Sequence, residues 1–452
     1  MKITKIEVKK LFGVFDHEIP LNTKDHITII HGPNGYGKTI LLTLVNAIFT
    51  SQYHKIRTIP FSELSISFDN KTILYLYKNS TPDDEKKKKS RNGGKLQMVF
   101  HTPHTKQKVH TITLDIERED LDFPVDIIDD LINGLERIGP RTWLYMPTGE
   151  KLSLSQVLNR FSHMLPFPDI RMKGEPPQLK KLKELININF IETQRLLNVS
   201  DSFRSSISRI QRSSRAMMLP AVIKYSEELS EAIQSKLAEY GSLSQSLDRT
   251  FPTRLVKRKH SKYPTIEALK AELNALEEKR SSLIAAGFLD EEREVDLKDL
   301  QKIDKSNINV LSVYINDVKD KLKVFDELTA RIDLLIKIIN SRFLHKQLSI
   351  NKKDGFIFKT SNGKVIPPNS LSSGEQHELV LLYEMLFKVK PNSLILIDEP
   401  EISLHVAWQQ EFLKDLQEIT RVVGFDVLIA THSPQIINDR WDLTVELKGP
   451  KQ

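Results

Sequence analysis

One short segment constrains the fold of this chain more than any other feature of its sequence. Residues 32–39 match the pattern G-x-x-x-x-G-K-[ST] at every fixed position and read Gly32-Pro33-Asn34-Gly35-Tyr36-Gly37-Lys38-Thr39. The β-branched run Ile27–Ile30 precedes the segment, and apolar residues at near-helical spacing follow it from Thr39 to Ile48. Because the pattern requires a strand before the loop and a helix after it, the segment predicts an α/β core that binds phosphate.

The residue types of this loop suit the phosphates of a nucleotide. Glycines let the backbone curl so that its N–H groups point inward, at the positive end of the following helix. Lys38 is expected to reach the β- and γ-phosphates, and Thr39 is expected to ligate Mg²⁺. The loop by itself does not distinguish GTPases, kinases and ATPases.

An acidic pair far downstream narrows this choice. Leu394–Ile397 is a short apolar run, as expected of a buried parallel strand, and Asp398 and Glu399 follow it directly. Asp398 is expected to hold Mg²⁺, and Glu399 to orient and deprotonate the attacking water. Such a pair can be a simple turn, but a catalytic pair is the better interpretation in a chain that also carries a phosphate loop.

Two further segments complete a recognisable order. Residues 371–376 read L-S-S-G-E-Q and open a predicted helix, whose N-terminus would offer backbone N–H groups to an anion or would simply be capped. Thr431-His432-Ser433 follows another apolar run, Val427–Ala430. The order of phosphate loop, serine–glycine segment, acidic strand and histidine resembles that of the ABC ATPases, and the resemblance covers residues 1–165 and 346–448.

This resemblance implies a nucleotide site shared between two chains. Two ATP molecules would be sandwiched in a homodimer, with Ser372 and Gly374 contacting the γ-phosphate that the other subunit holds. His432 would be the switch histidine, which also contacts the γ-phosphate and acts in catalysis with Glu399. Ser403 would lie in the D-loop, at the interface.

Departures from the family pattern indicate a branch. Transporters usually carry L-S-G-G-Q, whereas this chain has Ser373 and Glu375 in the third and fifth places, a variant that resembles repair, chromosome-maintenance and anti-phage ATPases. The run from Leu371 to Leu404 is similar to the ATPase subunits of the PARIS and Septu anti-phage systems, more nearly to PARIS. No glutamine lies in residues 145–149, where the relatives place their Q-loop, and Gln156 is left unassigned.

The middle of the chain differs in kind from both ends. Glycine is almost absent between residues 178 and 345, and apolar residues recur there at steps of three and four, from Leu311 to Phe343 most regularly. A coiled coil and a helical bundle explain this pattern equally well. Because Gly287 and the acidic stretch 290–296 separate two of the helices, we expect an antiparallel hairpin there.

The predicted architecture is therefore an α/β ABC-type core, interrupted by a helical insertion. The N-terminal half would span residues 1–177, the insertion 178–345 and the C-terminal half 346–452. Hairpins predicted at 64–77 and 97–114 would form an antiparallel side-sheet beside the core.

The composition excludes some kinds of site and limits the partners that the chain can have. Cysteine is absent, which excludes disulfides, thiolate catalysis and cysteine-ligated metals. No apolar run could cross a bilayer and no charged-then-apolar leader follows Met1, so we expect a cytoplasmic protein without membrane contact. The net charge of +7 permits DNA binding without requiring it. Two basic clusters, whose simpler reading is a solvated loop in each case, are Lys86, Lys87, Lys88, Lys89, Arg91 and Lys95, and Arg254, Lys257, Arg258, Lys259 and Lys262.

Three functions fit these observations. The first is an oligomeric ATPase that holds an effector nuclease or toxin and regulates it when a phage trigger protein is sensed. Only residues 434–452 follow the switch histidine, so the toxic chemistry is expected in a partner. The second is an ATP-gated DNA clamp or repair ATPase, and the third, which the helical insertion and the serine–glycine variant disfavour, is a transporter subunit.

Overall fold

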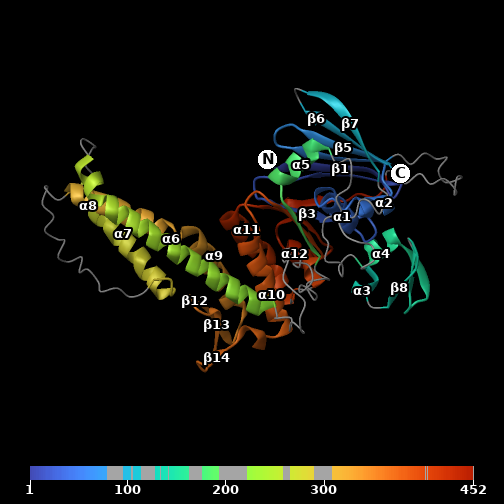
Figure 1. Ribbon diagram of the computed structural model, residues 1–452. Coiled ribbons are helices and arrows are strands. Elements are labelled where there is room, and N and C mark those ends of the chain that lie inside the picture. The colour runs from blue at the N-terminus through green and yellow to red at the C-terminus, as the bar shows by residue number, and fades with distance from the viewer. Residues whose placement is uncertain are drawn as a thin grey trace. The chain divides into compact units, whose positions relative to one another are not determined.

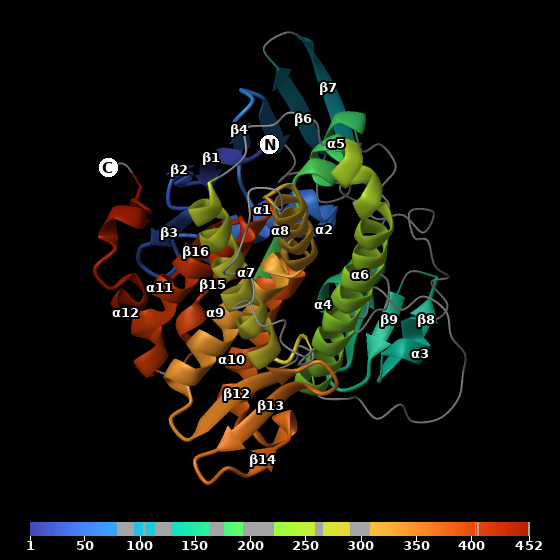
Figure 2. The same ribbon diagram turned by 90° about the vertical axis from the view of Figure 1, so that its left-hand side faces the viewer.

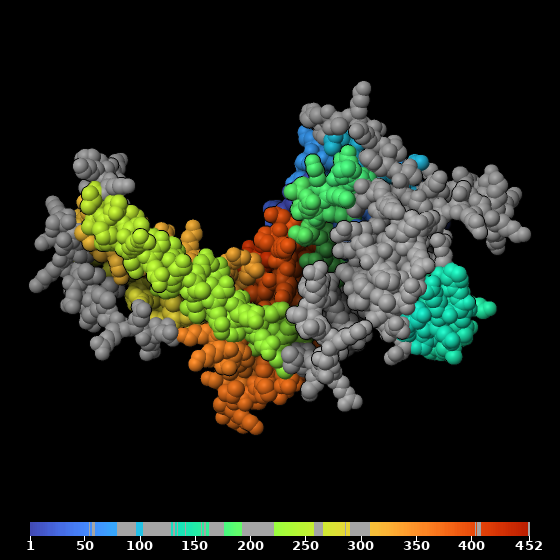
Figure 3. All heavy atoms as spheres, in the orientation of Figure 1, coloured from blue at the N-terminus to red at the C-terminus, as the bar shows by residue number. Residues whose placement is uncertain are grey.

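The computed structural model describes most of the chain, in two compact units. One unit comprises Met1–Met217 with Lys388–Gln452, and the other comprises Met218–Phe387. Figure 1 labels their elements and Figure 3 shows their atoms. The described residues are 1–78, 95–102, 105–113, 128–132, 134–140, 142–161, 176–192, 221–257, 265–289, 308–402, 404 and 406–450.

A parallel sheet of five strands forms the centre of the first unit, in the order β11-β15-β16-β3-β17. The predicted apolar runs are its middle strands, and Ile29, Ile395 and Leu428 are fully buried, as expected where helices cover both faces of a sheet. The strands are β3 (Ile27–His31), β11 (Ile188–Glu192), β15 (Leu394–Asp398), β16 (Asp426–Ala430) and β17 (Thr444–Glu446).

The predicted side-sheet is present as six antiparallel strands in the order β2-β1-β4-β5-β6-β7. Its apolar side chains share one buried core with those of α1 and of the parallel sheet, so the phosphate loop and its helix rest on both sheets. The strands are β1 (Ile3–Leu11), β2 (Phe15–Pro20), β4 (Glu63–Phe68), β5 (Ile73–Lys78), β6 (Lys95–Thr102) and β7 (Thr105–Thr113). Of the first basic cluster, only Lys95 lies within the described residues.

A third, smaller sheet has a core of its own around Trp143, whose indole Nε1 donates to Asp129 Oδ1 at 2.9 Å. Its strands are β8 (Leu135–Gly139), β9 (Thr142–Tyr145) and β10 (Glu150–Ser153). The α-helices of the first unit are α1 (Lys38–Phe49), α2 (Tyr53–Thr58), α3 (Ile128–Leu131), α4 (Leu154–Arg160), α5 (Pro177–Leu185), α11 (Val406–Val423) and α12 (Pro434–Ile437).

The predicted helical insertion, residues 178–345, begins too early, because this range includes β11. The apolar residues there recur at a period of two, with Ile186 and Ile188 buried and Asn189 exposed between Ile188 and Phe190. A period of two places alternate side chains on one face of a strand. The segment Ile188–Glu192 accordingly pairs in parallel with β15 in the central sheet, and the first unit extends past the predicted boundary.

The second unit is built from long helices, a small sheet and the helix that follows the serine–glycine segment. The four long helices are α6 (Ala221–Lys257), α7 (Ile266–Ala285), α8 (Ile308–Lys323) and α9 (Asp326–Arg342). The sheet comprises β12 (Lys346–Asn351), β13 (Gly355–Thr360) and β14 (Val365–Ile366), and it is followed by α10 (Ser373–Tyr383) and a π-helical turn, Glu384–Lys388. The unit therefore includes residues 346–387, which we had predicted to belong to the C-terminal half of the core.

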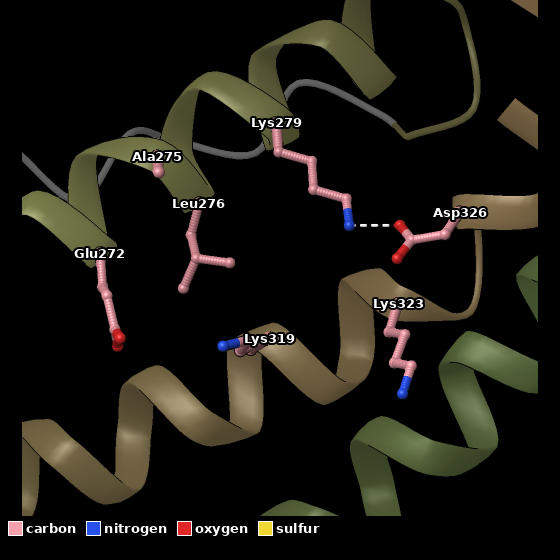
Figure 4. A pocket seen from close by; sticks show the side chains of 7 residues that line it. All are labelled: Glu272, Ala275, Leu276, Lys279, Lys319, Lys323 and Asp326. Atoms are coloured by element: carbon pink, nitrogen blue, oxygen red, sulfur yellow. Dashed lines mark hydrogen bonds and ion pairs between the residues drawn. The ribbon is translucent and has the colours of Figure 1, made fainter. Parts of the chain in front are cut away.

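The direction of the long helices corrects the predicted hairpin. Leu269 of α7 packs with Leu311 at the start of α8, and Lys279 of α7 pairs with Asp326 just beyond the end of α8. The two helices therefore run parallel, not antiparallel, as Figure 4 shows. The antiparallel neighbour of α8 is α6, because Arg254 at the end of α6 pairs with the buried Asp317, and Asp248, earlier in α6, pairs with Lys321, later in α8.

The long helices form a bundle and not a continuous two-stranded coil. Figure 2 shows α6, α7 and α8 side by side, and contacts link α8 to both of its neighbours. The apolar repeat noted from Leu311 to Phe343 does not lie on one helix, because α8 ends and α9 begins around Phe325, which is fully buried. Its ring lies 5.4 Å from that of Tyr240 and 6.1 Å from that of Phe288, so an aromatic cluster joins the helices. None of the described helices is long and apolar enough to span a membrane.

Candidate nucleotide site

The predicted phosphate loop connects β3 to α1. Gly35 and Gly37 have φ angles of 86° and 88°, in the left-handed region that favours glycine. A Cβ on Gly37 would lie 2.5 Å from Leu11 Cδ2, so the loop passes too close to β1 for a side chain. Gly37 is also the N-cap of α1, and no side chain caps this helix. The first N–H groups of α1 therefore lack a side-chain acceptor, as in sites that bind anions.

The ammonium group of Lys38 is held inside the loop. The Lys38 side chain is almost fully buried, and its Nζ donates to the carbonyl oxygens of Gly32 at 2.6 Å and Pro33 at 3.2 Å. Burying a charge is costly unless polar groups surround it. The loop therefore fixes a cation where its own N–H groups also gather.

Thr39 and Asp398 meet although the chain separates them by 359 residues. The Thr39 hydroxyl donates to Asp398 Oδ1 at 3.0 Å. The parallel sheet brings them together, because β3 and β15 both pair with β16 and end at the same edge. Hydroxyl and carboxylate oxygens are ligands that suit Mg²⁺, which takes one or two protein ligands beside substrate phosphates. The predicted metal residues thus fit Mg²⁺, and among the described residues no larger cluster of His, Asp and Glu offers another metal site.

The predicted catalytic residues meet at the same edge. Glu399 follows β15 with a φ of 47°, a strained value for a residue other than glycine, and its N–H donates to Ala430 O at 2.8 Å. His432 Nδ1 lies 3.6 Å from Glu399 Oε1. The carboxylate and the imidazole are therefore neighbours beside the Thr39–Asp398 pair.

This arrangement agrees with the family to which the chain can be assigned. The AAA ATPase domain family matches residues 1–437, nearly the whole chain. The chain belongs to this family. The residues described above are therefore the candidate nucleotide site of an ATPase of this family.

The individual proteins that the chain resembles share low sequence identity with it. "Retron Ec83 probable ATPase" from Escherichia coli is 26% identical over 234 residues, which are 47% of this chain and 42% of the relative's length. A solved Smc head domain with an extended coiled coil, from Pyrococcus furiosus, is 14% identical, with a TM-score of 0.37 over 99% of this chain and 94% of that chain. The SMC head domain of Thermotoga maritima is 10% identical, with a TM-score of 0.31 over 97% and 91% of the two chains.

Glu401 contacts the segment that contains His432, and the sequence did not predict these contacts. Its Oε1 accepts the Thr431 hydroxyl at 2.8 Å and the His432 N–H at 3.1 Å, and it lies 3.1 Å from His432 Nδ1. The sequence placed Glu401 at the start of the D-loop, close behind the acidic pair, but suggested no role for its carboxylate. Ser403, predicted to lie in the same D-loop, is outside the described residues.

A buried histidine supports the phosphate loop from the side-sheet, and the sequence did not suggest it. His17 Nε2 donates to Tyr36 O at 2.8 Å, and Phe15 stacks on the His17 ring at a centroid distance of 5.6 Å. Burial lowers the pKa of His17, against a smaller opposing effect of the Tyr36 carbonyl. The imidazole is therefore a neutral support for the loop near pH 7.

The C-terminal segment lies along the other side of the loop. Leu447 N–H donates to His31 O at 2.9 Å, and a Cβ on Gly32 would lie 3.2 Å from Leu447 O. A Cβ on Gly449 would lie 3.2 Å from the Tyr36 hydroxyl. Residues from β17 onward therefore enclose the phosphate loop.

The serine–glycine segment lies in the second unit, at the start of α10. Ser372 is the N-cap: its hydroxyl accepts the Glu375 N–H at 3.4 Å, and its own N–H donates to Glu375 Oε2 at 2.8 Å. Lys346 Nζ pairs with the same carboxylate at 2.6 Å. Outside its own helix, a Cβ on Gly374 would meet no described atom within 4 Å. The segment is thus a capped helix start whose glycine faces open space within this chain.

Contacts inside the second unit fix this helix firmly. The guanidinium group of Arg342 forms an ion pair with Glu378, and both side chains are almost fully buried. The Tyr225 hydroxyl donates to Glu384 Oε1 at 2.6 Å, just beyond α10. Lys346 therefore holds the start of α10, α9 holds its middle, and α6 holds the turn beyond its end.

Gln156, left unassigned, is engaged elsewhere. Its Oε1 accepts the Ser153 N–H at 2.8 Å, and its own N–H donates to the Ser153 hydroxyl at 3.4 Å. The two residues form a capping box at the start of α4. This structural role accounts for Gln156 without a Q-loop.

Proposed function

We propose that the chain binds ATP with Mg²⁺ and hydrolyses it to ADP and phosphate. The hydrogen bond between Thr39 and Asp398 carries this proposal, since it joins the phosphate loop to the acidic strand at one edge of the sheet. Bound Mg²⁺ would neutralise charge on the phosphates, and Thr39 and Asp398 would hold it. Lys38 would attract the β- and γ-phosphates, Glu399 would take a proton from the attacking water, and His432 would contact the γ-phosphate.

We also propose that the complete site needs a second copy of the chain. Ser372 accepts a hydrogen bond from Glu375, but a serine hydroxyl still has a proton to donate. The first N–H groups of α10 and the open side of Gly374 lie next to this hydroxyl. These groups suit the γ-phosphate held by a partner, as in the ABC ATPases that the sequence resembles.

Two substitutions test the chemistry. Lys38→Ala should weaken ATP binding, because the phosphates lose a fixed cation, whereas Glu399→Gln should bind ATP normally and hydrolyse it very slowly. A matched control is Glu411→Gln, an exposed glutamate of α11 in the same unit. The measurements are ATP affinity and phosphate release for all three variants. Normal hydrolysis by Glu399→Gln would show that another group is the base.

We propose an anti-phage role as a regulator of an effector nuclease or toxin. The match to the probable ATPase of a retron supports this role, as does the resemblance of the sequence to the PARIS and Septu ATPases, which stays a prediction. The test is co-expression of the chain with the products of neighbouring genes, followed by purification with and without ATP. Recovery of the chain alone under both conditions would contradict the proposal.

A groove in the second unit favours the alternative, an ATP-gated DNA-binding protein. It lies between α7 and α8 and has a volume of about 380 Å³. Its lining includes Ala275, Leu276 and Lys279 of α7 and, on the facing helix α8, Lys319 and Lys323 (Figure 4). Glu272 and Asp326 complete the lining and offset part of this charge. Binding of duplex DNA should weaken steeply with salt if lysines contact phosphates. No binding to labelled duplex at low salt would remove this alternative.

A further inference from the structure

Glu401 is a more buried carboxylate than the neighbouring Glu399, and nothing in the proposed hydrolysis uses it. Only 8% of its side chain is exposed, compared with 24% for Glu399 and 50% for His432. A buried carboxylate needs hydrogen-bond donors around it. The groups that approach this carboxylate in the described structure all belong to one segment, Thr431 and His432.

Three groups converge on a single oxygen of this carboxylate. Oε1 lies 2.8 Å from the Thr431 hydroxyl, 3.1 Å from the His432 backbone nitrogen and 3.1 Å from His432 Nδ1. The other oxygen, Oε2, is buried and has no hydrogen-bond partner among the described residues. The described contacts of the Glu401 carboxylate are therefore all with Thr431 and His432.

The contact with Nδ1 also sets which ring nitrogen faces outward. A carboxylate oxygen can only accept, so this approach favours the forms of the imidazole in which Nδ1 carries a proton. The remaining nitrogen, Nε2, then points away from Glu401. Carboxylates that orient histidines in this way are common behind the working histidine of an enzyme site.

We infer that Glu401 is a positioning residue, which holds the segment at Thr431 and fixes the orientation of the His432 ring for hydrolysis. The inference rests on the proposed ATPase activity. Glu401 touches no group of the phosphate loop in the described structure, so its effect should reach the reaction through His432 alone.

A double-mutant cycle tests this route. The variants are Glu401→Ala, His432→Ala and the two combined, with turnover measured over a range of ATP concentrations. Glu401→Ala should lower kcat by about tenfold and change KM by less than about twofold. The combined variant should be no slower than His432→Ala, because the effect of Glu401 disappears when its target is absent. Losses that multiply in the combined variant would overturn the inference.

Further variants separate positioning from loss of fold. Glu401→Gln keeps an oxygen that can accept the Thr431 hydroxyl and the His432 N–H, so it should recover part of kcat. Recovery of none would overturn the inference. If Glu401→Ala does not fold, Thr431→Val removes one donor only, and it should lower kcat in the wild-type chain but not in His432→Ala. An equal loss in both backgrounds would contradict the proposed route.

The Glu411→Ala control and the dependence of turnover on Lys38 distinguish a failure of the positioning role from a failure of the proposed ATPase activity. Glu411→Ala, on the exposed face of α11, should turn over at the wild-type rate. Turnover that depends on Lys38, together with multiplying losses at Glu401 and His432, would remove the positioning role but keep the ATPase. Turnover that does not depend on Lys38 would remove both.

Discussion

The two helix starts that the sequence predicts to bind phosphate are built in opposite ways. α1 begins after a glycine N-cap with no side-chain cap, and its loop is held from outside by Leu11 and His17. α10 begins with a serine N-cap in a closed capping box, and Lys346 holds the carboxylate of that box. Contacts from other segments therefore hold the start of α1 in shape, whereas the capping box within the start of α10 holds that start.

The difference indicates different tasks. A loop with uncapped N–H groups and a fixed ammonium suits tight binding of phosphates within one chain. A capped helix that keeps one hydroxyl proton and an open glycine suits a group that meets its ligand only when another chain brings it. Substitution of the glycine at each start should therefore affect different steps.

The largest effect is expected for Gly37→Ala. The left-handed conformation costs a residue with a side chain about 1–2 kcal/mol, and the new Cβ would clash with Leu11. The loop must move, so ATP affinity should fall by roughly a hundredfold. Binding of a labelled ATP analogue measures this change. The control is Gly241→Ala, inside α6, where a Cβ meets no described atom and a stability gain of up to about 1 kcal/mol is expected.

Gly374→Ala should leave binding intact and slow turnover. Its Cβ has space within the chain, and alanine favours a helix, so the melting temperature should stay equal or rise. ATP affinity should not change, but turnover should fall by roughly tenfold or more, because a partner's phosphate can no longer approach α10 closely. Weaker ATP binding by this variant would show that α10 acts within its own chain.

Mixing two impaired variants tests the shared site directly. In a mixed dimer of Lys38→Ala and Gly374→Ala chains, one site carries both changes and the other carries neither. Turnover should therefore rise when the two proteins are mixed, to about a quarter of the wild-type rate if half of the dimers are mixed. No rise, with mixed dimers demonstrated, would contradict a site built from two chains.

How far the sequence predicted these features depends on how local each signal is. The phosphate loop, the acidic pair and the apolar strands were predicted because neighbouring residues carry each pattern. The direction of α7 relative to α8 was predicted wrongly. The residues that connect two helices do not by themselves determine whether the second helix runs parallel or antiparallel to the first. Glu401 and His17 were missed for the same reason: their partners lie in segments that only the folded sheets bring near.

A smaller effect is expected at His17, beneath the phosphate loop. Since burial lowers the His17 pKa below 6.5, its contribution to stability is present above that pH and is lost as pH falls through the folded-state pKa. His17→Gln can still donate to Tyr36 O but cannot titrate. Its melting temperature should fall less than that of the wild type between ~pH 7 and ~pH 5. His17→Phe, which loses the hydrogen bond, should cost about 1 kcal/mol at pH 7.

The smallest effect is expected at the other helix start, for Lys346→Ala. Burial alone would raise the Glu375 pKa, but the Lys346 ammonium and the Ser372 groups outweigh it and bring that pKa below 4.5. The resulting stability is present above about pH 4.5 and is lost as pH falls through the folded-state pKa.

Removing Lys346 should therefore lower stability by less than about 1 kcal/mol at pH 7 and flatten its decline in acid, as thermal melts at several pH values will show. Lys364→Ala, an exposed lysine in the turn between β13 and β14, is the matched control and should change neither. Because Ser372 and Glu375 still cap the helix without Lys346, turnover should stay near normal. A collapse of turnover in Lys346→Ala would mean that α10 depends on its surroundings as α1 does, and the contrast between the two helix starts would no longer hold.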